Sequence, residues 1–254
     1  MRTWDNYKHR FFPLVLKKAL QIGKKINKNG IDDLNFNSSK IIGNLIKVLL
    51  SFDPCCQTNS QNMLKLAGFN LTRESSQVPG GGLGVFLSAG KAERGSLVAL
   101  YPGTVYYPTD PIFFQSINNQ FMFRCSDGVH IDGKDRGLSK SIFKSCVNRD
   151  RFGHHLIADT SWLTPSLVSP LNIGQYVNNR SSGRPANVAY HEMTIPADFP
   201  IHLRKYIPNI SYRTVFLDEA GNFPPLKIVG LVATRLIQEG DELYSTYISV
   251  VDES

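Results

Sequence analysis

From about residue 76 onward, the chain is a succession of short apolar runs separated by glycine and proline turns. The runs are residues 85–88, 96–101, 129–132, 187–194 and 228–234. Turn-forming pairs such as Pro102 with Gly103 and Asp132 with Gly133 follow them. Short runs bounded by turn signals are typical of strands. This part of the chain is therefore predicted to be mainly β, and it contains no internal repeat.

The first seventy residues have a helical pattern instead, in which apolar residues recur at every third or fourth position. Ser38 or Ser39 is a candidate N-cap, and Gly68 is a candidate stop. The spacing predicts helices over residues 11–26, 40–52 and 61–67.

The change of pattern near Ser75 predicts two regions in a chain of 254 residues, which is long enough to bury a sizeable core. Residues 1–75 are expected to form a basic helical N-terminal region, and residues 76–250 a β-rich domain. Within that domain, residues 108–171 give mixed signals and are expected to form an insert.

The positive charge lies in the N-terminal region. Residues 1–50 hold ten of the 28 lysines and arginines and three of the 21 acidic residues, so they carry the whole formal net charge of +7. Three interpretations remain open. The first is a helix that packs on its own domain, the second is a mitochondrial targeting segment, and the third is a surface that contacts a polyanion such as nucleic acid or anionic lipid.

The cysteines and the apolar runs indicate the compartment. The four cysteines lack both the spacing of a disulfide framework and the paired C-x-x-C of a structural zinc site, and they are Cys55, Cys56, Cys125 and Cys146. No apolar run approaches the roughly 20 residues of a membrane span. We expect an intracellular protein of the nucleus or cytoplasm, with the mitochondrion as the alternative.

Three motifs could carry chemistry, and each is weak by itself. They are Gly82-Leu83-Gly84, then Gln175-Tyr176-Val177-Asn178-Asn179 with Asn187 after it, and finally Gly240-Asp241-Glu242-Leu243 with Tyr247. The glycine motif lacks the Gly-Lys-Ser/Thr of a phosphate loop. The sequence has no G-x-S-x-G, no H-E-x-x-H and no metal-binding spacing of its histidines. Metal catalysis and serine or cysteine hydrolysis are therefore not favoured.

In this order, together with Leu97-Val98-Ala99-Leu100-Tyr101-Pro102-Gly103, these motifs resemble a SET domain over roughly residues 80–250. The resemblance implies a fold of small curved β-sheets around a C-terminal segment that threads under a loop. This pseudoknot is an exception to the rule that chains do not thread their own loops.

The same resemblance implies a protein-lysine N-methyltransferase that uses S-adenosylmethionine and acts on a protein substrate. Tyr247 would lie beside the sulfonium and the lysine channel, and Tyr176 would add an aromatic face suited to cationic groups. The residues expected to bind the cofactor are Gly82, Leu83, Gly84, Asn178, Asn179 and Tyr247. The reaction requires no metal.

The chain departs from the SET pattern at one point. The usual Asn-His-Ser-Cys is replaced by Asn178-Asn179-Arg180-Ser181, so both the histidine and the cysteine are missing. An alternative function is therefore a catalytically weak or inactive SET scaffold that acts as a protein-interaction module. A third is nucleic-acid binding through residues 1–50, with an affinity that falls steeply with salt.

Overall fold

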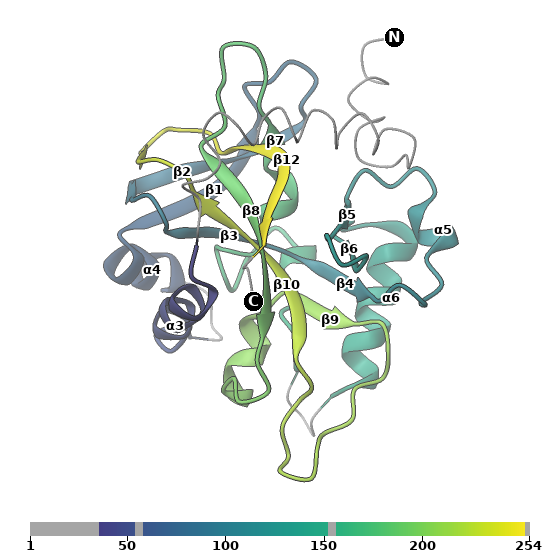
Figure 1. Cartoon of the computed structure of the whole chain (residues 1–254). Helices are drawn as coiled ribbons and strands as arrows, with labels where there is room; N and C mark the ends of the chain where they lie inside the picture. The colour runs from purple at the N-terminus through teal and green to yellow at the C-terminus, as the bar shows by residue number, and fades with distance from the viewer. Residues whose placement is uncertain (1–35, 54–57, 152–155, 252–254) are drawn as a thin grey trace.

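The computed structural model describes residues 36–53, 58–151 and 156–251, and for residues 247–251 it describes the backbone alone (Figure 1). The helix predicted at residues 11–26 and most of the basic segment lie outside the described residues. Within the described part, short strands form three small sheets, and helices flank them on two sides. The predicted mainly β fold with helices is confirmed.

Two helices precede the sheets and lie beside the first of them (Figure 1). They are α3 (Ser38–Leu49) and α4 (Asn59–Ala67), close to the two helices predicted for this part of the chain. None of the described helices is both long enough and apolar enough to cross a bilayer.

The N-cap of α3 is Asn37, whose side-chain oxygen accepts a hydrogen bond from the Lys40 backbone N–H at 2.8 Å. The prediction of Ser38 or Ser39 as the cap was wrong by one or two positions, because both serines already lie inside the helix. The apolar face of α3 is buried in the same core as the sheets, through Ile41, Ile42, Leu45 and Leu49.

The strands are short, and most of them pair antiparallel. The first sheet has the order β1-β2-β11, with β1 (Phe69–Ser75), β2 (Leu83–Ala92) and β11 (Ile237–Gln238). The second has the order β3-β10-β8-β12-β7, with β3 (Leu97–Tyr101), β10 (Leu226–Ala233), β8 (Val188–Ile195), β12 (Tyr244–Val251) and β7 (Asn178–Asn179). The third has the order β5-β6-β4-β9, with β5 (Met122–Arg124), β6 (His130–Asp132), β4 (Gly103–Tyr106) and β9 (Asn209–Ser211).

The C-terminal strand β12 lies between β7 and β8, two strands that come earlier in the chain, and it is parallel to both. Both ends of the loop that joins β7 to β8 form backbone hydrogen bonds with β12. Arg180 N–H donates to the Ser245 carbonyl at 2.9 Å, and Asn187 N–H donates to the Tyr244 carbonyl at 2.9 Å. The C-terminal strand β12 is thus inserted between β7 and β8, next to the loop that joins them, as the SET resemblance implies.

The insert contains two helices, α5 (Phe113–Ser116) and α6 (Gly137–Arg149), on the flank opposite to α3 and α4 (Figure 1). The helix α6 buries Phe143, Cys146 and Val147 in a second core around Trp162. Single 3-10 turns follow α6 at η1 (Ser161–Leu163), η2 (Gly174–Tyr176) and η3 (Ile201–Tyr206).

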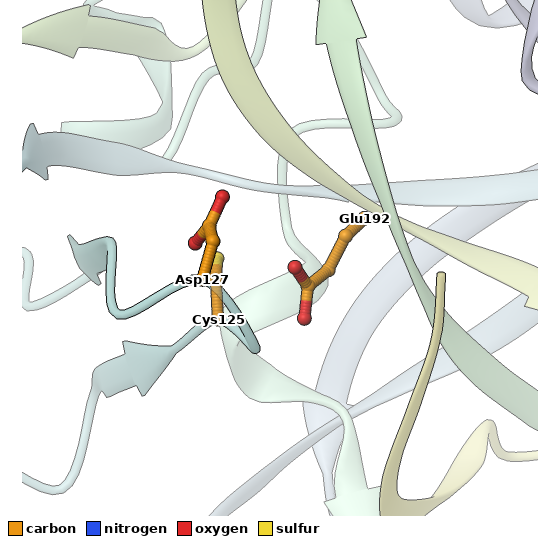
Figure 2. Close-up of side chains that lie close together, drawn as sticks. All are labelled: Cys125, Asp127 and Glu192. Atoms are coloured by element: carbon orange, nitrogen blue, oxygen red, sulfur yellow. The ribbon is translucent and has the colours of Figure 1, made fainter. Parts of the chain in front are cut away.

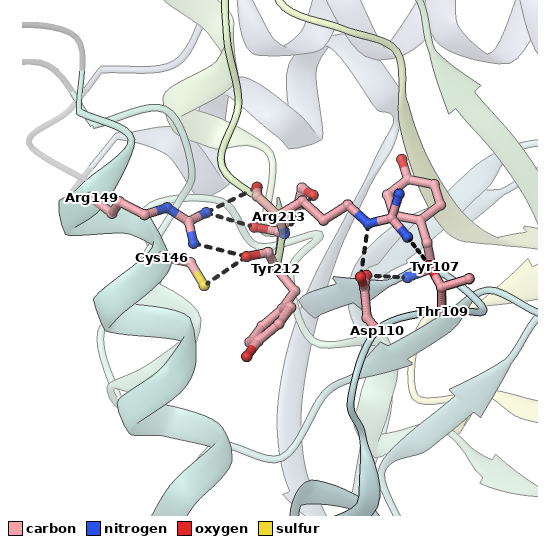
Figure 3. Close-up of polar contacts among 8 residues, drawn as sticks. Tyr107, Thr109, Asp110, Cys146, Arg149, Tyr212 and Arg213 are labelled. Carbon is pink, nitrogen blue, oxygen red and sulfur yellow. Dashed lines mark hydrogen bonds and ion pairs between the residues drawn. The ribbon is translucent and has the colours of Figure 1, made fainter.

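The end of α6 is fastened to the segment that follows β9 (Figure 3). The Arg149 guanidinium donates to the carbonyls of Tyr212 and Arg213 at 2.8 and 3.0 Å. It also forms an ion pair with the buried Asp150 at 2.7 Å. The two backbone contacts hold the end of α6 against the segment that follows β9.

Asn59 connects the N-terminal helices to the rest of the domain, because its fully buried amide bonds the Asp53 backbone and donates to the Val168 carbonyl at 2.8 Å. We predict that Asn59→Ala lowers the free energy of unfolding by about 2–3 kcal/mol, since it leaves several buried groups unpaired. Urea unfolding measures this, with the exposed Gln61→Ala as the control. Equal stability of the two variants would contradict the connection.

Candidate functional site

The carboxylate of Glu242 joins three segments that are far apart in the sequence. It is buried, and it accepts hydrogen bonds from Ser76 Oγ at 2.6 Å and from the Gln77 N–H at 2.8 Å. The Tyr244 hydroxyl donates to it at 2.6 Å, and Asn178 Nδ2 donates at 3.3 Å. We call these five residues the Glu242 cluster. Because a buried carboxylate is stable only when its oxygens are bonded, the cluster fixes these segments relative to one another.

The glycine motif lies directly against this cluster. A Cβ on Gly84 would collide with the Glu242 carboxylate, so only glycine fits there. The neighbouring Leu83 is exposed, and its carbonyl accepts a hydrogen bond from Asn178 Nδ2 at 2.9 Å. Gly82 has open space where a side chain would stand. Gly82 and Leu83 are therefore exposed, whereas Gly84 is buried against the Glu242 cluster.

Asn187 holds the start of β12 in place. Its Nδ2 donates to the Glu242 carbonyl at 2.8 Å, and its Oδ1 accepts from the Tyr244 N–H at 2.8 Å. The buried amide thus bonds both sides of Leu243 as a neighbouring strand would. The result is a fixed position for the segment that carries Glu242.

The two asparagines of β7 differ in what they contact. Asn178 is opposite Tyr244 and holds the glycine motif, whereas Asn179 is opposite Ser245. The Oδ1 of Asn179 is buried and has no hydrogen-bond partner among the residues that the structure describes. Buried polar atoms without partners are uncommon in folded proteins, so this oxygen is a candidate ligand-binding atom.

Tyr176 precedes β7, and both its hydroxyl and its ring contact neighbouring side chains. Its hydroxyl donates to Asp135 Oδ2 at 2.6 Å, and the Arg73 guanidinium lies 4.8 Å from the centre of its ring. Burial, and then the bond to Asp135, raise the pKa of Tyr176 to about 12. The hydroxyl therefore stays protonated at neutral pH, and Tyr176 can offer a ligand its aromatic surface rather than a basic oxygen.

The backbone of Tyr247 lies in β12, three residues after Tyr244, while its side chain is outside the described part of the structure. An aromatic group lies beside this strand. Tyr190 bonds Ser245 Oγ through its hydroxyl at 3.2 Å, and its ring contacts Phe123 at 4.8 Å between centroids. Tyr101 completes the group at 5.3 Å from Phe123.

The sequence-predicted residues Gly82, Leu83, Gly84, Asn178 and Asn179 are thus brought together next to β12, and Tyr176 lies just before them in the chain. The sequence analysis gave no role to four members of the Glu242 cluster, although Glu242 itself lies in the third motif; they are Ser76, Gln77, Glu242 and Tyr244. An acid between a glycine turn and an apolar strand, as in Gly240-Asp241-Glu242-Leu243, is a signal for Glu242. No comparable signal marks Ser76.

A second group of polar side chains has the composition of a metal centre (Figure 2). Cys125, Asp127 and Glu192 bring their ligand atoms within 4.8 Å of one another. However, the Lys227 ammonium already pairs with Asp127 at 2.9 Å and with Glu192 at 3.0 Å. Burial, and then Glu192, raise the pKa of the Cys125 thiol far above its ordinary value. A protonated thiol and an ammonium in the place of a cation make this a structural ion-pair group.

We predict that Glu242→Gln lowers the free energy of unfolding by about 2–4 kcal/mol. The new amide would point donors at Ser76, Tyr244 and Asn178, which donate hydrogen bonds to the carboxylate. Thermal and urea unfolding measure the loss, and the exposed Glu239→Gln in the same turn is the control. A fully stable Glu242→Gln protein would show that the cluster does not hold these segments together.

Comparison with known proteins places the chain in a family. No model of a protein family matches it. It is 47% identical over 189 residues to SET domain-containing protein 9 of Pongo abelii, a match that covers 74% of this chain and 67% of that protein. It is 48% identical over 189 residues to SET domain-containing protein 9 of Homo sapiens, covering 74% of this chain and 61% of that protein. With these identities and this fold, the chain belongs to the SET domain family.

Proposed function

We propose that the chain is a protein-lysine N-methyltransferase that uses S-adenosylmethionine. The observation that carries the proposal is the Glu242 cluster, which gathers the glycine motif, β7 and β12 at one place. In this proposal residues 76–250 are the SET domain and residues 108–171 are the insert that shapes the substrate groove. Exposed apolar side chains of the insert, Phe113, Phe114 and Ile117, are suited to contact a protein substrate.

The residues present are suited to this cofactor. In this proposal the exposed Gly82 and Leu83 lie along the cofactor, with Gly84 beneath them, and Asn178 and Asn179 lie beside its adenosyl part. The unpartnered Oδ1 of Asn179 supports this assignment, because the amino group of an adenine is a hydrogen-bond donor. When bound, the cofactor supplies an activated methyl group on a positively charged sulfur.

The task of the protein is to position and desolvate the substrate lysine. A lysine with a pKa near ~10.4 must lose its proton before it can accept a methyl group. Burial next to a second positive charge lowers that pKa. In the proposal the hydroxyl of Tyr247 orients the neutral amine. The aromatic group of Tyr101, Phe123 and Tyr190 is suited to line its path.

The proposal also accommodates the missing histidine of the SET pattern. Asn179 retains the main-chain groups of that position, and β7 stays paired with β12 through Ser245. The pseudoknot is secured by other residues, namely Asn187 and Glu242, so it does not depend on a histidine side chain. Absence of cofactor binding by the folded protein would instead favour the inactive-scaffold alternative.

We predict that full-length protein binds S-adenosylmethionine in calorimetric titration and that Asn179→Ala weakens binding about tenfold, the effect of one hydrogen bond. Its melting temperature should not fall, because the deleted oxygen has no protein partner. Asn70→Ala is the matched control, since Asn70 also has a buried, unpartnered Oδ1 but lies at the far end of β1. Equal affinities of the two variants would contradict the assignment of Asn179.

The Tyr247→Phe variant tests the rate of methyl transfer separately from the affinity for the cofactor. We predict that this variant keeps its affinity for S-adenosylmethionine but transfers methyl groups at least about 100-fold more slowly, because the hydroxyl orients the amine. Transfer of labelled methyl to an array of lysine peptides measures the rate, and the same peptides with arginine in place of lysine are the control. A wild-type rate in Tyr247→Phe would remove Tyr247 from the mechanism.

A further inference from the structure

A cavity lies away from the Glu242 cluster, beside the segment that joins β9 to β10. In Figure 1 this segment is the long loop at the lower end of the view, whereas β7 and β12 are at the upper end. The cavity has a volume of about 200 Å³, and its walls are largely apolar, with Ile157, Ile210, Val215, Phe223 and Leu226. No residue of the glycine motif or of the Glu242 cluster lines it.

One of the lining residues, Arg204, is a buried arginine that has no acidic partner in the part of the chain that the structure describes. Arg204 is 4% exposed, and its guanidinium lies 5.9 Å from the ring of Phe199 and 5.6 Å from the ring of Phe223. Within the described residues, its polar contact is a long hydrogen bond from Nη2 to the Pro224 carbonyl at 3.3 Å. Its Nε is buried and has no hydrogen-bond partner. Among the described residues no carboxylate pairs with it.

The arginines nearby are neutralised, which makes Arg204 an exception (Figure 3). Arg149 pairs with Asp150 at 2.7 Å, and Arg213, which also lines the cavity, pairs with Asp110 at 2.7 Å. Burial lowers the pKa of Arg204 to about 10, so the guanidinium still carries its charge at neutral pH. An unpaired buried charge is strongly unfavourable unless something compensates for it, and the two aromatic faces do so only in part.

A second polar atom of the lining also lacks a partner. Asn209 donates through Nδ2 to the Tyr101 carbonyl at 2.9 Å, but its Oδ1 is buried and unbonded. An anionic ligand cannot bond this acceptor oxygen, so the charge of Arg204, between apolar walls, is the feature of the lining that selects the ligand. The volume is below the roughly 300–1,000 Å³ of drug-sized pockets, which favours a small ligand over a peptide or a nucleotide.

We propose that this cavity is a binding site for a small organic carboxylate, whose charged group bonds the guanidinium of Arg204 and whose apolar body packs on Ile210, Val215 and Phe223. A single carboxylate matches the charge and the planar fork of one arginine. Inorganic phosphate fits less well, because it carries more charge and needs more donors than this apolar lining offers. The site is independent of cofactor binding and of methyl transfer.

The proposal is tested by calorimetric titration of the full-length protein with benzoate and hexanoate, and with the neutral benzamide and hexanamide. The carboxylates should bind at least about tenfold more tightly than their amides, since only they neutralise Arg204. Arg204→Met should lose this preference and should unfold at the same temperature or higher, because it removes an unpaired buried charge. Lys205→Met, which removes a charge from the same 3-10 turn η3 outside the lining, should leave the preference intact.

A second variant keeps the test independent of how Arg204→Met folds. Val215→Trp fills the cavity from the partly exposed loop and leaves Arg204 in place, so it should abolish carboxylate binding. Equal binding of carboxylates and amides, unchanged binding in either variant, or no binding to the folded protein at about 10 mM ligand would each overturn the proposal. Since S-adenosylmethionine titration is a separate measurement, failure here leaves the proposed methyltransferase function standing.

Discussion

A buried carboxylate must have its oxygens satisfied, and in this protein that requirement determines how the candidate site is assembled. The donors to Glu242 come from residues 76–77, from β7 and from the start of β12. Gly84 lies so close to the Glu242 carboxylate that any side chain at this position would collide with it. Removing one partner would leave charge or polar groups unpaired away from water, so the cluster forms as a unit. The glycine motif, the two asparagines and the strand that carries Tyr247 are near one another for this reason.

The insertion of β12 between β7 and β8 is the second constraint. Because its partner residues in β7 and β8 precede it by more than fifty positions in the chain, the pairing of β12 is non-local. Asn187 stabilises the start of β12, because its side-chain amide forms hydrogen bonds with the backbone on both sides of Leu243. A site built on such an insertion is held by many long-range contacts, which suits chemistry that depends on positioning.

The sequence allows five of the strands to be predicted because their signals are local, but it missed others, such as β1 (Phe69–Ser75), which lies in the region expected to be helical. Apolar runs between turns identified β2, β3, β6, β8 and β10, and helical spacing identified α3 and α4. The helix α6 escaped prediction, because its serines, lysines and cysteine give a weak periodic pattern. The N-cap Asn37 was missed by one or two positions. The partners of Glu242 and the isolation of Arg204 depend on residues far away in the chain, which no local pattern reports. The family resemblance predicts the glycine, asparagine and Tyr247 positions as site residues, but it does not predict the Glu242 cluster beside them.

In the proposed methyltransferase, the glycine motif and the asparagines of β7 hold S-adenosylmethionine. A crystal structure of the full-length protein grown with S-adenosylhomocysteine, the product of methyl transfer, tests it most directly. We predict that the adenosyl group lies against Asn178 and Asn179, with the main chain of Gly82, Leu83 and Gly84 along the rest of the ligand. An adenosyl group bound elsewhere, or a well-ordered site without ligand at saturating concentration, would contradict the claim.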